Sequence, residues 1–325
     1  MYWGFGYQRY WDSTYSNGVI GFEPAGDSYS LGDAVLRDEF QLAPNRLLVS
    51  AGMRVDYTSY SRFDYQPSLR LLYTPSARQS LWAAVSRAVR VPSRVDRDMA
   101  AEEGDVMIGV LPIHQLFRGS ESMRPEVENS LEVGYRFQSG QRWSADFATF
   151  WSYYTSLAAI AVPQQLQVQM VGGVPELVLN FLAVNSATAR SYGGEASATW
   201  QLTPAWRLRP SYSYLDVDAR MPPNHMWMLD TSGYRHQGAL RSQYDLSRHW
   251  QLDLTARVHS RNALWDLPGV VLFDARVAWQ PYRDTEFNFS MQDLTGREVV
   301  ETYAQTPFAS IPTRRTFLVR WVQRF

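Results

Sequence analysis

Residues 313–325 read TRRTFLVRWVQRF, and the order of apolar and polar side chains in this stretch points to the fold class. Read at every second residue, one side of an extended chain carries Phe317, Val319, Trp321 and Phe325. Arg320 and Arg324 fall on the other side. Successive side chains of a β-strand point to opposite faces, so this period of two predicts a strand with one apolar face.

The same alternation recurs along most of the chain. It is found in residues 2–11, 28–42, 47–58, 69–73, 81–85, 131–138, 143–153, 195–202, 206–214, 250–259, 271–280 and 286–292. We therefore predict about 14 antiparallel strands, each close to the roughly 10 residues that a tilted membrane strand requires.

Composition limits the class of protein further. Hydrophobic residues make up 45% of the 325 residues, charged residues 19% and aromatic residues 14%, and the net charge is -1. No basic surface therefore indicates nucleic acid as a partner. The absence of cysteine fits an oxidising compartment. No run approaches the roughly 20 apolar residues of a membrane helix, so a membrane would be crossed by strands.

Two features favour a membrane barrel over a soluble β-sandwich, which would show the same alternation. Short turns at 139–141, 203–205, 246–249 and 281–284 alternate with long loops at about 91–126, 157–190, 216–233, 260–268 and 294–312. Aromatic residues beside the short turns resemble an interfacial girdle: Trp143, Trp206, Trp250, Trp279, Tyr282 and Phe325. We expect an all-β, transmembrane, antiparallel up-and-down β-barrel with short periplasmic turns and long extracellular loops.

Five stretches, in the same order, resemble the C-terminal barrel of a TonB-dependent outer-membrane receptor. They are 86–93 (SRAVRVPS), 123–126 (MRPE) with 130–135 (SLEVGY), 192–195 (YGGE), 267–269 (LPG) with 273–274 (FD), and 292–295 (QDLT). Asp293 departs from the family, which more often has Asn before the Leu. The resemblance covers about residues 30–325 and implies a location in the bacterial outer membrane.

The chain end also resembles the closing strand of outer-membrane barrels, which the barrel assembly machinery recognises. In this comparison Phe317, Val319, Trp321 and Phe325 are the assembly signal, and Gln323 departs from the usual apolar residue.

The resemblance implies a receptor that imports a scarce ligand, often a ferric siderophore or cobalamin, with energy passed from the inner membrane. Such receptors have an N-terminal plug and about 22 strands. We expect residues 1–325 to be the C-terminal part of a larger barrel, without a plug domain. The TonB complex is then a partner only if an N-terminal plug is present, whereas outer-membrane lipid is a partner in either case.

Candidate ligand-binding residues follow from charge and aromaticity in the predicted loops. Arg87, Arg90 and Arg94, in a run that ends at Arg97, could hold an anionic ligand such as a ferric siderophore. The alternative is pairing with nearby carboxylates, namely Asp96, Asp98, Glu102 and Glu103. Aromatic residues could stack on a ligand, or pack within the loops: Trp227, Tyr234, Trp265 and Phe308.

Metal and catalytic chemistry have weaker signals. A soft-ligand set, Met221, His225, Met226 and Met228, could bind copper, or could simply pack against neighbouring loops. No hydrolase or phosphate-loop motif is present, so we expect no catalytic residues, no cofactor and no enzyme activity. An outer-membrane hydrolase would have to use residues such as Asp216, Asp218, His225 and Asp230.

A second class of function stays open from the sequence. The chain could be a self-contained passive channel that closes by pairing residues 2–11 with 313–325, because an even strand number permits closure and an open edge is a liability.

Overall fold

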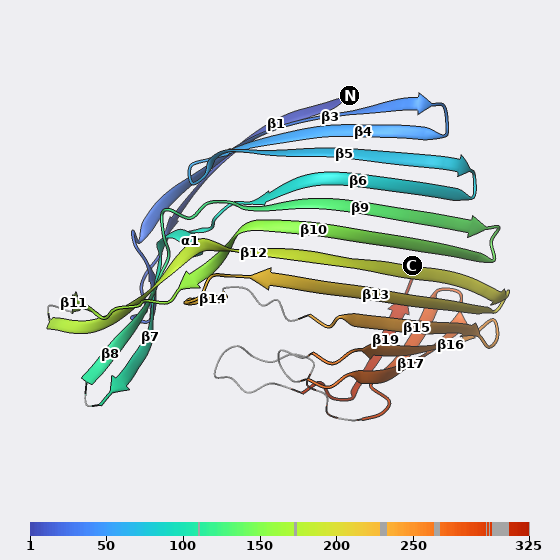
Figure 1. The fold of residues 1–325 in the computed structure, drawn as a ribbon. Coiled ribbons are helices and arrows are strands. Elements are labelled where there is room, and N and C mark those ends of the chain that lie inside the picture. Colours follow the sequence, from blue (N-terminus) through green and yellow to red (C-terminus); the bar gives the residue numbers. More distant parts are fainter. Residues whose placement is uncertain are drawn as a thin grey trace.

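The computed structural model describes residues 1–109, 111–171, 174–227, 233–262, 267–296, 298, 300 and 312–324. Within these residues the chain is almost entirely β, with 19 strands and one short helix. Figure 1 shows long strands lying side by side in one curved sheet. No helix in these ranges is long and apolar enough to span a membrane.

Fourteen of the strands follow one another in an antiparallel up-and-down succession. They are β1 (Tyr2–Ser13), β3 (Gly26–Ala43), β4 (Leu47–Thr58), β5 (Arg62–Ser76), β6 (Gln79–Arg90), β9 (Glu126–Ser139), β10 (Trp143–Ala161), β12 (Val174–Thr203), β13 (Trp206–Arg220), β15 (His236–Asp245), β16 (Trp250–His259), β17 (Val270–Tyr282), β18 (Thr285–Gln292) and β19 (Thr316–Gln323). This arrangement confirms the predicted all-β class with antiparallel up-and-down strands.

The other elements lie in the segments between the main strands. They are β2 (Ile20–Phe22), α1 (Arg94–Asp98), β7 (Met99–Ile108), β8 (Leu111–Arg118), β11 (Gln167–Val171) and β14 (His225–Trp227). Most of them gather at the long-loop end of the sheet, where β8 pairs in parallel with β12 (Figure 1). The prediction of about 14 strands was therefore too low, and the predicted loop 157–190 was wrong in its bounds because β10 and β12 extend into it.

The two faces of the sheet differ as the alternation predicts. We call the face with exposed apolar side chains the outer face and the other the inner face. On the outer face Phe147 is 48% exposed and Leu131 45%. On the inner face Asp253 is 3% exposed and Asn288 7%. Burial of polar groups on one face and exposure of apolar groups on the other suits a wall with lipid outside and a polar interior.

Aromatic side chains lie on the outer face beside the short turns. Phe137 contacts Trp143 with ring centroids 5.1 Å apart, and Trp250 contacts Trp279 at 5.7 Å. The first pair flanks the turn between β9 and β10. Trp143, Trp206, Trp250 and Tyr282 are terminal residues of their strands, and Trp279 lies three residues before the end of β17. Phe325 lies outside the described residues.

The succession of strands ends at two edges. In the described part of the chain β1 pairs with β3 and β19 with β18, and no pairing joins β1 to β19. Phe317, Val319 and Trp321 lie on one face of β19, opposite residues of β18, and Trp321 is 66% exposed. On β1, Phe5 is 82% exposed. Both edge strands therefore present apolar side chains and unpaired backbone groups.

Candidate ligand-binding site

The long-loop end of the sheet is organised by the helix α1. Ser93 caps this helix: its hydroxyl accepts from the Asp96 backbone N–H at 3.4 Å, and the Asp96 carboxylate accepts from the Ser93 backbone N–H at 2.7 Å. This reciprocal capping box satisfies two N–H groups that a helix leaves without partners. Pro92 precedes the cap and disfavours a helical residue before it. After β6 the chain therefore enters α1 at Arg94.

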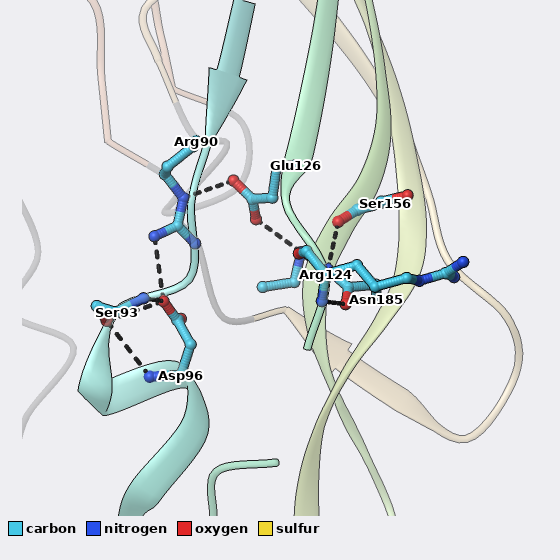
Figure 2. A network of polar contacts seen from close by, with 8 residues as sticks. Arg90, Ser93, Asp96, Arg124, Glu126, Ser156 and Asn185 are labelled. Carbon is cyan, nitrogen blue, oxygen red and sulfur yellow. Dashed lines mark hydrogen bonds and ion pairs between the residues drawn. The ribbon is translucent and has the colours of Figure 1, made fainter. Parts of the chain in front are cut away.

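Arg90 joins this helix to the wall, as Figure 2 shows. Its Nε donates to Glu126 Oε2 at 2.7 Å, and its Nη1 lies 3.3 Å from Asp96 Oδ2. Glu126 is 8% exposed, and its other oxygen accepts from the Ala158 backbone N–H at 2.8 Å. One buried carboxylate thus holds β6, β9 and β10 together.

Asn185 makes a second connection beside it (Figure 2). Its side-chain oxygen accepts from the Arg124 backbone N–H at 2.6 Å, and its amide donates to the carbonyls of Arg124 at 2.9 Å and Ser156 at 2.6 Å. Ser156 has a φ of 57° where the register of β10 with β12 shifts. The irregularity frees the Ser156 carbonyl from the ladder, and Asn185 satisfies it.

Arg94 also has partners within the protein. It forms ion pairs with Asp98, at 3.1 Å, and with Asp12, and its guanidinium lies 4.9 Å from the Phe22 ring centroid. The alternative predicted from the sequence is observed in part: Arg90 pairs with Asp96 and Arg94 with Asp98, whereas their other carboxylate partners, Glu126 and Asp12, were not predicted. Their role in ligand binding stays a prediction.

Arg87 lies on the other face of the sheet. It has the outer-face alternation of Leu81 and Val85, and its guanidinium stands 4.2 Å from the Tyr65 ring centroid and donates to the Tyr65 carbonyl. The structure therefore separates Arg87 from Arg90, and its role in ligand binding also stays a prediction.

A second polar cluster surrounds Tyr60, in the turn between β4 and β5. Tyr60 donates to Asp27 at 2.5 Å, and Arg97 lies 4.3 Å from its ring centroid. The Tyr60 hydrogen bond is the main cause that lowers the pKa of Asp27 below its usual value. Burial, followed by the bond to Asp27, raises the pKa of Tyr60. Both groups therefore keep their pH 7 forms over a wide range.

The remaining predicted residues are scattered. His225 lies on β14 with its Nδ1 3.0 Å from the Pro223 carbonyl oxygen, Met226 is 40% exposed, and Met221 is half-buried. The described residues contain no group of three or more His, Cys, Asp or Glu suited to a metal ion. Trp265, Phe308, Met228, Asp230 and the side chain of Trp227 lie outside the description.

The two described aspartates considered for hydrolysis, Asp216 and Asp218, contact residues other than His225. Asp216 lies 2.9 Å from Arg235 and accepts from Tyr192 at 2.8 Å, while Asp218 pairs with Arg220 at 2.9 Å. Within the described ranges no hydrogen bond or ion pair joins either aspartate to His225.

A recess of about 500 Å³ opens on the inner face of β10, β12, β13, β15 and β16. Two neighbouring rows in register form its floor. One row is Asp146, Ser197, Ser211, Ala239 and Arg257, and the other is Ala148, Glu195, Ser213, Gln237 and His259. In the first row three small central side chains, Ser197, Ser211 and Ala239, leave the space between Asp146 and Arg257. In the second row the small Ser213 lies between the longer Glu195 and Gln237, and His259 stands at one end.

Charge at the rim of the recess is largely balanced. Asp146 pairs with Arg136 at 2.5 Å, and Arg257 pairs with Asp274 at 2.8 Å. Glu195 is exposed in the middle of the floor. Beside these groups a planar ligand could meet aromatic and hydrogen-bonding side chains at once.

Tyr234 is the predicted ligand residue that lines this recess. The ring centroids of Tyr234 and His259 are 3.9 Å apart. Nε2 of His259 is buried and has no hydrogen-bond partner in the described part of the chain. The recess was not predicted from the sequence, although the small residues on the polar face of 195–202 and 206–214 were its signal.

Comparisons with known proteins place this geometry in context. Residues 2–294 match the family model described as TonB dependent receptor-like, beta-barrel. A mutant of the Pseudomonas aeruginosa ferric enterobactin receptor PfeA, in complex with enterobactin, is similar with a TM-score of 0.78 at 14% identity, over 99% of this chain and 51% of that chain. A comparison with curated protein sequences finds no match.

Two further solved structures are similar. The siderophore receptor PirA from Acinetobacter baumannii has a TM-score of 0.71 at 13% identity, over 93% of this chain and 46% of that chain. The copper transporter OprC has a TM-score of 0.67 at 15% identity, over 92% of this chain and 48% of that chain. The chain spans about half the length of these structures. With the family model matched over most of its length, the chain belongs to the TonB-dependent receptor-like β-barrel family, whose barrels are outer-membrane proteins.

Proposed function

We propose that this chain is the wall of an outer-membrane receptor that takes up a scarce ligand of the ferric siderophore or metal chelate class. The observation that carries the proposal is the family match over residues 2–294, and the polar inner face with its recess supports it. PfeA is named as a ferric enterobactin receptor and PirA as a siderophore receptor. Receptors of this family are transporters, which favours transport over catalysis.

The proposed larger barrel is supported by the two sheet edges. The described pairings leave β1 and β19 each with one neighbour, and lipid offers no hydrogen bonds to unpaired backbone. We propose that residues 1–325 are the C-terminal part of a larger receptor barrel, in which further strands cover these edges. A plug and the TonB complex would then be partners of the whole receptor.

The recess gives the proposal a specific test. Ser211→Trp places an indole in the middle of the floor, so we expect it to weaken binding of ferric enterobactin at least tenfold. Ser144→Trp is the matched control, because Ser144 lies on the inner face of β10 outside the recess. Binding would be measured by tryptophan quenching on folded receptor in detergent. Equal affinity in both variants, or no binding to unaltered receptor by any ferric siderophore tried, would contradict the proposal.

A passive channel is the second candidate. It is favoured by the even number of strands in the main succession, which permits β1 to pair antiparallel with β19. Stepwise conductance from this chain refolded in planar bilayers would support closure and an open pore. Absence of steps from a correctly inserted chain would leave the receptor as the remaining candidate.

A further inference from the structure

A row of polar residues crosses four neighbouring strands on the outer face. The register pairs Arg87 of β6 with Asn129 of β9, Asn129 with Tyr153 of β10, and Tyr153 with Arg190 of β12. Neighbouring strands lie about 4.8 Å apart, so the two arginines are about 14 Å apart at their Cα atoms. We call these four residues the outer polar row.

The outer polar row marks the boundary of the apolar band. The same strands carry a row of apolar and aromatic residues two positions closer to the short turns. The side chains of this row are 44–46% exposed: Val85, Leu131, Trp151 and Tyr192. Apolar and aromatic residues of this kind suit the acyl region and its interface. The outer polar row therefore lies at the level expected for lipid headgroups at the long-loop end.

The two arginines of this row contact aromatic rings. Arg87 lies over Tyr65, and Arg190 lies 5.7 Å from the Tyr153 ring centroid. Among the described residues neither forms an ion pair with a carboxylate, whereas Arg90 on the inner face forms two. Asp218, opposite Arg190 in the register, pairs with Arg220 at 2.9 Å. Two positive charges thus remain on the outer face, each placed over a ring.

We propose that the outer polar row binds the phosphate groups of an outer-leaflet lipid. A guanidinium donates two parallel hydrogen bonds to phosphate oxygens, and the Asn129 amide and Tyr153 hydroxyl supply further donors between the two arginines. The separation of the arginines suits a lipid that carries two phosphates. The inference rests on the membrane placement in the proposed function, and it assigns Arg87 to lipid rather than to the transported ligand.

The test uses the receptor as its cell makes it, purified in detergent and checked for a folded barrel by its faster gel migration before boiling. Native mass spectrometry would measure binding of diphosphoryl lipid A, enzymatically dephosphorylated lipid A and inorganic phosphate. We expect the receptor to bind diphosphoryl lipid A more tightly than either other probe. The apolar band binds acyl chains, which inorganic phosphate lacks, and the arginines bind phosphates, which the dephosphorylated lipid lacks.

Substitutions then locate the site. Each arginine near a charged lipid surface contributes about a fivefold effect, so Arg87→Gln with Arg190→Gln should weaken diphosphoryl lipid binding about 25-fold. Lysine at both positions should restore most of it. Arg70→Gln with Arg209→Gln removes the same charge from exposed inner-face positions and should leave binding within about twofold. If the double outer variant fails to fold, Arg190→Gln alone can be tested, because among the described residues the Arg190 side chain makes no hydrogen bond to the backbone, whereas that of Arg87 does. This single variant should still bind diphosphoryl lipid A about fivefold more weakly.

Either of two results would overturn the inference. One is a folded outer variant that loses no more affinity than the inner-face control. The other is unaltered receptor that binds dephosphorylated lipid equally well. Failure of the proposed function is distinct, because it would appear as absence of a folded barrel in lipid or of siderophore binding.

Discussion

The ring of Trp82 on β6 lies against the backbone of Gly134 on β9. A Cβ added to Gly134 would stand 2.3 Å from Cε2 of that ring, far inside contact distance. The two residues are directly paired in the register and share the inner face. Aromatic cover of a glycine on a neighbouring strand fixes register and shields the backbone.

Gly134→Ala should therefore destabilise the folded wall by about 1–3 kcal/mol, because Trp82 must leave its position. Guanidinium unfolding in detergent, followed by tryptophan fluorescence, would measure this. Gly32→Ala is the control, since its Cβ would meet nothing nearer than 3.9 Å. Equal midpoints for the two variants would show that the ring adapts freely.

Gly193→Ala should cost more than Gly134→Ala. Its Cβ would lie 2.2 Å from the Tyr214 carbonyl oxygen and 2.7 Å from Phe150 Cζ, so backbone as well as side chain would have to move. The same unfolding measurement ranks the two, and a smaller loss for Gly193→Ala would contradict this account of the strand.

Glu126→Ala should destabilise the protein by about 1–3 kcal/mol, because it leaves the Ala158 N–H without its acceptor and Arg90 without its nearest carboxylate. Limited proteolysis should also cut residues 91–125 faster. The exposed pair Arg220–Asp218, 71% and 50% exposed, provides the control. Arg220→Gln should cost less than about 1 kcal/mol. Equal costs would mean that burial of Glu126 contributes nothing.

Asp27 gives a pH dependence with a defined sign. Its folded pKa lies below the usual 3.8, so its stabilising contribution is present above that pH and is lost as pH falls through the folded value. The stability difference between unaltered protein and Asp27→Asn should shrink below about pH 4. Unfolding midpoints from pH 6 to 2.5 test this, and a difference that grows on acidification would contradict it.

The main strands were predictable because each must show lipid one face and a polar interior the other. The accessory strands were not. At its start β12 pairs with β11 and β8, and only from Leu182 onward with β10. Val178, Ala183 and Ala187 are buried at 0–5% exposure in this part of the strand, and the alternation fades. A parallel pairing between segments so far apart along the chain has no local sequence signal.

The arginine contacts, too, were predictable from the sequence only in part. Arg87 and Arg90 are an odd number of residues apart on one strand, so the alternation already implied opposite faces. The pairing of Arg94 with Asp12 joins residues 82 apart in sequence and required the fold. The recess needed the register of five strands, which alternation within one strand cannot give.

Energy-coupled transport would be measured as uptake of ⁵⁵Fe-labelled ferric siderophores, beginning with ferric enterobactin, by cells with and without the gene. We expect that deletion abolishes uptake of at least one chelate, that the gene restores it, and that a protonophore stops it within minutes. Unchanged uptake of every chelate after deletion, or restored uptake that persists with the protonophore, would contradict an energy-coupled receptor.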